Sequence, residues 1–182
     1  MTLSTLTSAE ETHRTLLEKW RRAMDLVGPG PVAPHFEDAA HAVQWLEGTK
    51  GAWADLGSGA GFPGVALAAR HPEVRVTLVE SRQKRATFLK EVVHRAALSN
   101  AKVFHGRSEA LESGAWDGVI SRAYRPPEDY LADALRLLRS GGTAVLLLAR
   151  QEIPQLEGLT VFHVEHYAVN DQPRRAVGYH KD

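Results

Sequence analysis

The 182-residue sequence contains no cysteine, and its formal net charge at neutral pH is zero. Without cysteine the chain cannot form disulfides, thiolate metal sites or a cysteine nucleophile, which excludes a disulfide-stapled secreted fold. No apolar stretch approaches the ~20 residues that a membrane-spanning helix needs. Residues 1–14 are polar and acidic and lack the basic-then-apolar layout of a secretory signal peptide. We therefore expect a cytoplasmic protein with no membrane partner.

The residues that are present have the composition of an ordinary globular domain. Charged residues make up 24% and hydrophobic residues 43% of the chain, a balance that argues against disorder. The length corresponds to about one domain and allows a sizeable buried core. We expect a single compact unit and a monomer, in which residues 1–50 form a helical cap packed on a core of residues 51–182.

Hydrophobic periodicity predicts two helices followed by alternating strands and helices. Ser8 is the expected N-cap of the first helix, and Glu11 would complete a capping box. The expected helices cover residues 8–24, 35–46, 63–70, 82–98 and 128–138, the last one closed by the glycines at 141 and 142. The expected strands cover residues 53–56, 74–80, 102–105, 117–121, 143–149, 159–169 and 176–180. This alternation predicts an α/β fold, a doubly wound and mostly parallel sheet with an N-terminal helical cap.

A glycine-rich loop follows the first predicted strand and opens a helix. It reads Asp55-Leu-Gly57-Ser-Gly59-Ala-Gly61-Phe-Pro-Gly64. Glycines let the backbone approach a ligand closely, and a helix N-terminus adds free N–H groups. Glu80 ends the next strand, where a carboxylate can accept hydrogen bonds from both hydroxyls of a ribose. The combination predicts a nucleoside site in preference to a turn that only packs helix on strand.

The residues alone leave two kinds of nucleoside cofactor open. The segment Gly59-Ala-Gly61-Phe-Pro-Gly64 satisfies the G-x-G-x-x-G pattern, so an NAD-linked oxidoreductase is one alternative. In the second interpretation Asp55 precedes three alternating glycines, which resembles motif I of S-adenosylmethionine (AdoMet)-dependent methyltransferases. Asp55 would then help to hold the loop or a cationic tail. We favour AdoMet because the same carboxylate would repel a pyrophosphate.

Longer segments make this resemblance more specific. The run Gly57-Ser-Gly-Ala-Gly-Phe-Pro-Gly64 resembles the glucose-inhibited division protein B family, the small-subunit ribosomal RNA guanine-N7 methyltransferases. Other segments resemble the family in the same order: His35-Phe-Glu-Asp38, Glu80-Ser-Arg-Gln-Lys84, His105-Gly-Arg107-Ser-Glu109 and Trp116-Asp-Gly-Val-Ile-Ser-Arg122-Ala. The resemblance covers roughly residues 14–181. It implies a Rossmann-like class I methyltransferase fold and AdoMet as the cofactor.

The resemblance also implies roles for individual residues. The implied cofactor residues are Gly57 and Phe62 along AdoMet, Gly59 and Gly61 in shaping the loop, Glu80 at the ribose, and Ser108 and Glu109 at the adenine. Arg122 would reach both the cofactor and the reacting base, and it is the candidate catalytic residue. Lys84 and Arg107 would serve the RNA or the cofactor pocket, and His35 would face the active site as a further RNA contact. Arg150 is the candidate to replace a lysine that the family carries after the fifth strand.

The implied chemistry requires few catalytic groups. Guanine N7 has an in-plane lone pair and no proton, so it can attack a sulfonium methyl without a general base. Such a reaction needs alignment and electrostatic control, in agreement with a sequence that has no evident catalytic triad. We expect Arg122 to donate to guanine O6. The alternative is that Arg122 only caps its strand or pairs with an acidic side chain.

Charge is distributed unevenly despite the zero total. Residues 70–107 contain nine basic and three acidic residues, and Arg125 is expected at the mouth of the site, where Arg174 and Arg175 would join it. Local basic patches bind phosphates, so the expected partner is small-subunit ribosomal RNA or an assembling subunit. A small-molecule methyltransferase and a non-catalytic RNA- or nucleoside-binding module are the remaining alternatives. Tyr124 would either stack on a base or cover the core.

The nine histidines do not predict a metal site. His163 and His166 are the nearest pair, but a spacing of three on a strand points the two rings to opposite faces. No ligand spacing typical of zinc sites appears elsewhere. We therefore expect no metal.

Overall fold

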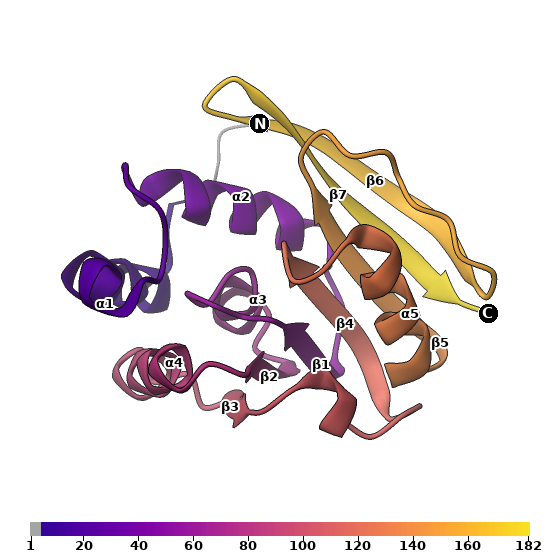
Figure 1. The fold of residues 1–182 in the computed structure, drawn as a ribbon, viewed down its shortest axis with the longest axis horizontal. Coiled ribbons are helices and arrows are strands. Elements are labelled where there is room, and N and C mark those ends of the chain that lie inside the picture. Colours follow the sequence, from indigo (N-terminus) through magenta and orange to yellow (C-terminus); the bar gives the residue numbers. More distant parts are fainter. Residues whose placement is uncertain (1–4) are drawn as a thin grey trace.

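The protein forms a seven-stranded sheet flanked by helices, and the computed structural model describes residues 5–182 (Figure 1). The strands are β1 (Gly51–Leu56), β2 (Val74–Glu80), β3 (Ala101–His105), β4 (Trp116–Arg122), β5 (Leu138–Leu148), β6 (Leu159–Val169) and β7 (Gln172–Lys181). The α-helices are α1 (Ser8–Met24), α2 (Ala33–Gln44), α3 (Gly64–Arg70), α4 (Gln83–Arg95) and α5 (Pro127–Leu137), and a 3₁₀ turn η1 covers Ser108–Ala110.

The strands lie side by side in the order β3-β2-β1-β4-β5-β7-β6. Strands β1 to β5 pair in parallel, whereas β7 runs antiparallel to both β5 and β6. The chain winds outward from β1 to β3 and then returns to the other side of β1 with β4. Open α/β sheets bind ligands at the carboxyl ends of the strands beside such a reversal. The predicted doubly wound, mostly parallel sheet is confirmed.

Two hydrophobic clusters cover the two faces of the sheet. One joins the sheet to α1, α2, α3 and α4, and the other joins it to α5. Strand β5 contributes to both, since Val145 and Leu147 belong to the first cluster and Ala144, Leu146 and Leu148 to the second. Burial on both faces explains why this strand is almost continuously apolar.

The N-terminal helices are tied to the core by buried polar contacts. Glu10 of α1 is 1% exposed, and its two carboxylate oxygens accept hydrogen bonds from Nε and Nη2 of Arg70, each at 2.9 Å. His13 is equally buried, and its Nε2 lies 2.7 Å from the carbonyl oxygen of Ala60. These bonds reach α3 and the loop before it. They support the expected single unit of cap and core, which stays a prediction.

The structure corrects two local predictions. Thr7, not Ser8, is the N-cap of α1: its Oγ1 accepts from the Glu10 amide at 3.2 Å, and Glu10 Oε2 accepts from the Thr7 amide at 2.8 Å. Glu10 therefore takes the place predicted for Glu11, because Ser8 is already helical. The glycines at 141 and 142 do not close α5, which ends at Leu137. They lie within β5, because Leu138 already pairs with Trp116 of β4.

Candidate active site

The glycine-rich loop leaves the carboxyl end of β1 and leads into α3. Gly57, Gly59 and Gly61 have φ angles of 68°, 56° and 100°, which L side chains rarely adopt. Space is short as well, since a Cβ at Gly57 would lie 2.6 Å from Cδ2 of Tyr124. A Cβ at Gly61 would lie 3.0 Å from Cε1 of His13. The backbone conformation therefore favours glycine at all three positions, and close contacts add to this requirement at Gly57 and Gly61.

Asp55 holds this loop from inside the protein. Its side chain is fully buried, and its Oδ2 accepts a hydrogen bond from the amide of Gly64 at 3.1 Å. A Cβ at Gly64 would lie 2.4 Å from the same oxygen. Burial raises the pKa of Asp55 to about 7, although the hydrogen bond from Gly64 and the charge of Arg122 act in the opposite direction. The sequence allowed Asp55 to hold the loop or a cationic tail, and in the structure it holds the loop.

Glu80 bridges the glycine-rich loop and the start of α4. Its Oε2 accepts from the amide of Gly59 at 2.9 Å, and its Oε1 accepts from the amide of Arg82 at 2.7 Å. The residue is only 5% exposed, yet it lines a cavity of about 310 Å³. Each carboxylate oxygen keeps a second lone pair. Glu80 can therefore accept ribose hydroxyls without releasing the loop, and the ribose role stays a prediction.

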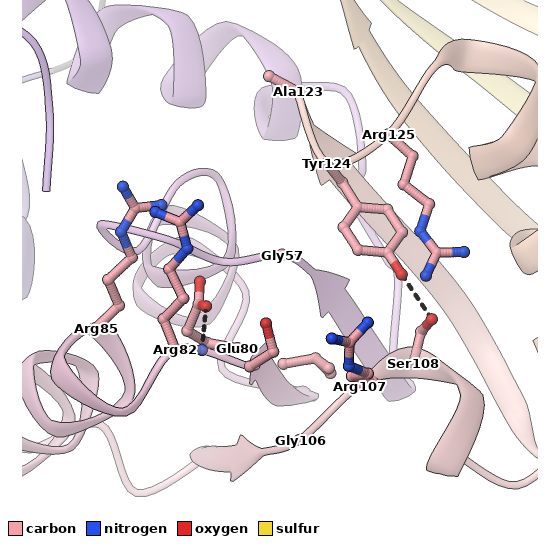
Figure 2. A pocket seen from close by; sticks show the side chains of 12 residues that line it. Gly57, Glu80, Arg82, Arg85, Gly106, Arg107, Ser108, Ala123, Tyr124 and Arg125 are labelled. Carbon is pink, nitrogen blue, oxygen red and sulfur yellow. Dashed lines mark hydrogen bonds between the residues drawn. The ribbon is translucent and has the colours of Figure 1, made fainter.

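This cofactor cavity, as we name the space lined by Gly57, Glu80, Arg107, Ser108 and Tyr124, lies at the carboxyl edge of the sheet (Figure 2). The ring of Tyr124 packs against Gly57, and its Oη shares a 2.6 Å hydrogen bond with Oγ of Ser108. Tyr124 thus lies inside the cofactor cavity. Arg82 and Arg85 extend over the rim beside Glu80.

The cofactor cavity gathers only part of the predicted cofactor set. Gly57, Glu80 and Ser108 line it together. The other five lie outside its lining: Gly59, Gly61, Phe62, Glu109 and Arg122. The cofactor roles of all these residues stay predictions.

Glu109 and Arg125 form an ion pair at the rim of the cavity. Arg125 Nη1 also lies 3.2 Å from Oδ2 of Asp133. The hydrogen bond from Arg125 lowers the pKa of Glu109 to about 2, and the same bond raises the pKa of Arg125. The sequence assigned Glu109 to adenine and Arg125 to RNA. In the structure the two side chains bind each other.

A second cavity of about 440 Å³ adjoins the cofactor cavity and shares Ala123 and Arg125 with it. We name it the acceptor cavity. Its lining comes from α2, β4, β5 and β7 and includes His35, Asp38, Arg122, Leu148, Gln151 and Arg174. Ala123 at the boundary has a φ of 54°, so the chain turns sharply where β4 ends.

Arg122 lines the acceptor cavity in a defined orientation. Its Nη1 donates to Oδ2 of Asp38 at 3.0 Å, and its guanidinium carbon lies 4.8 Å from the centre of the Phe62 ring. The ion pair considered as an alternative from the sequence is therefore present. It engages one of the five N–H donors of a guanidinium, and the side chain remains 21% exposed. A catalytic role for Arg122 stays a prediction.

The other predicted RNA contacts are distributed around the two cavities. Arg107 is exposed and lines the cofactor cavity, whereas Lys84 is exposed in the first turn of α4, outside both cavities. His35 lines the acceptor cavity with its ring stacked on Phe62 at 5.6 Å. Burial lowers the pKa of His35, and the charge of Arg122 lowers it further, so the ring is neutral near pH 7. Whether these residues contact RNA stays a prediction.

Arg150 is absent from the lining of the acceptor cavity, although its neighbours Ala149 and Gln151 belong to it, and Nη2 of Arg150 donates to Oε1 of Gln172 at 2.7 Å. Arg174 of β7 lines the cavity instead.

Sequence reasoning missed Tyr167, whose Oη donates to Oδ1 of Asp38 at 2.8 Å, although the two residues are 129 positions apart in the chain. No local pattern signals such a contact. The burial of His13 was also missed, but it could have been predicted from the sequence, because His13 lies on the same helix face as the buried Leu16 and Leu17 of α1.

The described part of the chain offers no cluster of three or more His, Asp or Glu side chains that could hold a metal ion. None of the helices in residues 5–182 is long and apolar enough to cross a membrane.

The strand order, the acidic and glycine-rich loop after β1 and the acidic end of β2 define a Rossmann-like methyltransferase. A family model described as rRNA small subunit methyltransferase G matches residues 9–174. The chain is also 32% identical to ribosomal RNA small subunit methyltransferase G of Paracoccus denitrificans over an alignment of 184 residues. This alignment covers 97% of this chain and 95% of the relative. The chain belongs to the rRNA small subunit methyltransferase G family, and the predicted family is confirmed.

Solved structures share the fold. A predicted O-methyltransferase from Agrobacterium tumefaciens superimposes with a TM-score of 0.61 at 27% identity, over 78% of this chain and 79% of that one. A SAM-dependent methyltransferase from Aquifex aeolicus superimposes with a TM-score of 0.63 at 14% identity, over 87% of this chain and 97% of that one. The first likeness agrees with the methyltransferase class, and the second shows that the fold is shared.

Proposed function

We propose that the protein transfers a methyl group from AdoMet to N7 of a guanine in small-subunit ribosomal RNA. The observation that carries the proposal is the junction of two cavities at Ala123 and Arg125, one fitted to a nucleoside and one lined by Arg122. Membership of the rRNA small subunit methyltransferase G family supports the class of substrate. Two adjoining cavities are what a transfer between a cofactor and a base requires.

AdoMet fits the residues of the cofactor cavity. Glu80 would accept the ribose hydroxyls with its free lone pairs, and Ser108 would lie at the adenine. Gly57 carries no side chain, so its backbone lies directly at the cavity beside the Tyr124 ring, where a Cβ would approach Cδ2 to 2.6 Å. When bound, AdoMet supplies an electrophilic methyl carbon on a sulfonium.

The acceptor cavity would hold the guanine. N7 would form a bond to the methyl carbon with its lone pair, the electrons of the broken S–C bond would stay on sulfur, and no proton would move. Arg122 would donate to O6 and so orient the ring. Methylation makes the ring cationic, and the Asp38 carboxylate offsets the charge of Arg122 so that the two cations do not oppose each other. Leu146 to Leu148 of β5 contribute apolar side chains to the lining of this cavity.

The proposal is tested by incubating the protein with methyl-labelled AdoMet and small ribosomal subunits from cells that lack this modification. Label in the RNA, mapped to N7 of a guanine by chain cleavage and primer extension, supports it. Fully methylated subunits serve as the control, and protein-free RNA shows whether an assembled particle is needed. Labelling of free nucleosides alone would assign a small-molecule methyltransferase, and binding of NAD without AdoMet would assign an oxidoreductase. Binding of AdoMet without any labelled product would indicate a non-catalytic module.

A further inference from the structure

Tyr167 of β6 is connected to Arg122 through a single carboxylate. Tyr167 Oη donates to Oδ1 of Asp38 at 2.8 Å, and the other oxygen, Oδ2, accepts from Arg122 Nη1 at 3.0 Å. Asp38 itself is 7% exposed. One buried carboxylate thus joins the C-terminal hairpin, the helical cap and the end of β4.

Contacts other than the bond to Asp38 also hold Tyr167 in place. Its ring stacks on the imidazole of His41 at 4.4 Å with an interplanar angle of 14°, and α2 and β6 pack against each other. Burial raises the pKa of Tyr167, and the Asp38 carboxylate raises it further. The phenol therefore remains protonated and donates its hydrogen bond at any pH near neutrality.

The phenol removes a degree of freedom from the ion pair. A carboxylate bound only by Arg122 can rotate about its χ2 bond, because χ2 of aspartate is a broad torsion. With Oδ1 anchored by Tyr167, the position of Oδ2 is determined. The guanidinium then has a fixed edge at Asp38 and a fixed face against Phe62, 4.8 Å away. Misplacement of a reacting geometry by about 1 Å can cost ~10²-fold in rate, so such support affects catalysis.

We propose that Tyr167 is a positioning residue, which orients the Arg122 guanidinium toward the acceptor cavity through Asp38. The effect of Tyr167 on the reaction rate rests on the methyl transfer proposed above. Its effect on the orientation of Arg122 is independent of that proposal, so the rate and the orientation are measured separately.

The first test compares Tyr167→Phe with Tyr179→Phe. Both changes remove one phenol hydroxyl and keep the ring, and Tyr179 Oη donates to the carbonyl of Pro154 at 3.1 Å, among residues that line neither cavity. We expect Tyr167→Phe to lower kcat about fivefold to tenfold, with the KM for AdoMet within about twofold. Tyr179→Phe should leave kcat unchanged. A kcat of Tyr167→Phe equal to that of the wild type overturns the proposal.

The second test asks whether Tyr167 acts through Asp38. In an Asp38→Asn background the further change Tyr167→Phe should lower kcat by less than about twofold, because coupled residues are non-additive. The same fivefold to tenfold loss in both backgrounds would show that Tyr167 acts by another route and would overturn the proposal.

The third test needs no methyl transfer. The Nε–H signal of Arg122 in a ¹⁵N-labelled protein is assigned by its loss in Arg122→Lys. We expect Tyr167→Phe to shift or broaden this signal and Tyr179→Phe to leave it in place. An unchanged signal in Tyr167→Phe overturns the proposal. If the wild type methylates no RNA, the proposed function fails while this signal still decides the orientation of Arg122.

Discussion

The cofactor cavity and the acceptor cavity are assembled from the sequence in different ways. The loop and Glu80 on the cofactor side come from one continuous stretch, residues 55–80, and are joined by hydrogen bonds within it. The acceptor side takes Asp38 from α2, Arg122 from β4 and Arg174 from β7. The loop and Glu80 are thus joined within one local stretch, whereas the acceptor cavity forms only once distant segments have packed together.

The two sides also differ in how their charges are compensated. Arg122 faces a buried carboxylate, and Arg125 at the boundary faces two carboxylates. At the cofactor rim, Arg107 is exposed, and the only carboxylate among the residues that line that cavity is Glu80. Arg122 of the acceptor cavity is thus an oriented and neutralised cation, whereas Arg107 of the cofactor cavity is exposed to solvent.

The largest effect is expected for Arg122→Ala. Loss of one oriented donor should lower the methyl-transfer rate about 10³-fold, while the dissociation constant of S-adenosylhomocysteine changes less than about threefold, because Arg122 does not line the cofactor cavity. Single-turnover rates and calorimetric titration measure the two quantities, and the melting temperature checks the fold. A matching loss of cofactor affinity would show that the two sides are not separable.

The next effect concerns pH and belongs to the cofactor side. The folded chain keeps the proton of Asp55 up to about pH 7, whereas the usual pKa is 3.8, so stability from this group falls as pH rises between these values. Burial of His13, whose pKa is lowered from 6.5 to about 4, has the opposite effect and raises stability over a similar range.

Asp55→Asn should remove the pH dependence of stability that comes from Asp55 and keep the one that comes from His13. The unfolding free energy of the variant relative to the wild type should therefore rise between pH 4 and pH 7, by roughly 4 kcal/mol at most. Urea unfolding of both proteins at several pH values measures this difference. A difference that does not vary with pH would show that Asp55 is ionised throughout.

Glu80→Gln should weaken cofactor binding about 10- to 30-fold, since hydrogen bonds to a charged acceptor are worth more than those to an amide. The rate of methyl transfer at saturating AdoMet should change little, because Glu80 is absent from the acceptor lining. Titration and saturation kinetics separate the two constants. A loss confined to kcat would contradict the ribose role.

The smallest effect compares Lys84, which lies outside both cavities, with Arg125, which lies at their junction. Lys84→Gln should reduce the slope of log K against log salt concentration, measured for binding to the small subunit, by about one. Arg125→Gln should reduce it less, because Glu109 and Asp133 already compensate its charge. Filter binding at several salt concentrations measures both slopes. A larger change for Arg125 would show that RNA displaces its carboxylates.

The sequence predicted the fold and the glycine-rich loop after β1 for a physical reason. Strand and helix periodicity, positive-φ glycines and the acid at the end of β2 are local properties, and the strands over residues 74–80 and 159–169 were predicted with the bounds observed. The start of β5 was missed because Leu138 becomes a strand residue only by pairing with Trp116.

The acceptor side was predictable only in part. The resemblance to the family implied a role for Arg122 and included Asp38 in one of its segments, but the ion pair of these two residues and the bond to Tyr167 depend on tertiary packing. The assignment of Arg125 to RNA illustrates the same limit. The sequence shows a positive charge that could bind an RNA phosphate, whereas in the folded protein Arg125 pairs with the carboxylates of Glu109 and Asp133.

The bond between Tyr167 and Asp38 spans 129 residues, and a ribosome makes the chain from one end to the other. Every residue that lines the cofactor cavity is synthesised by position 125. Asp38 has no tyrosine partner until β6 has been added. Translation therefore imposes a time order in which every residue that lines the cofactor cavity is present before the tyrosine that binds Asp38.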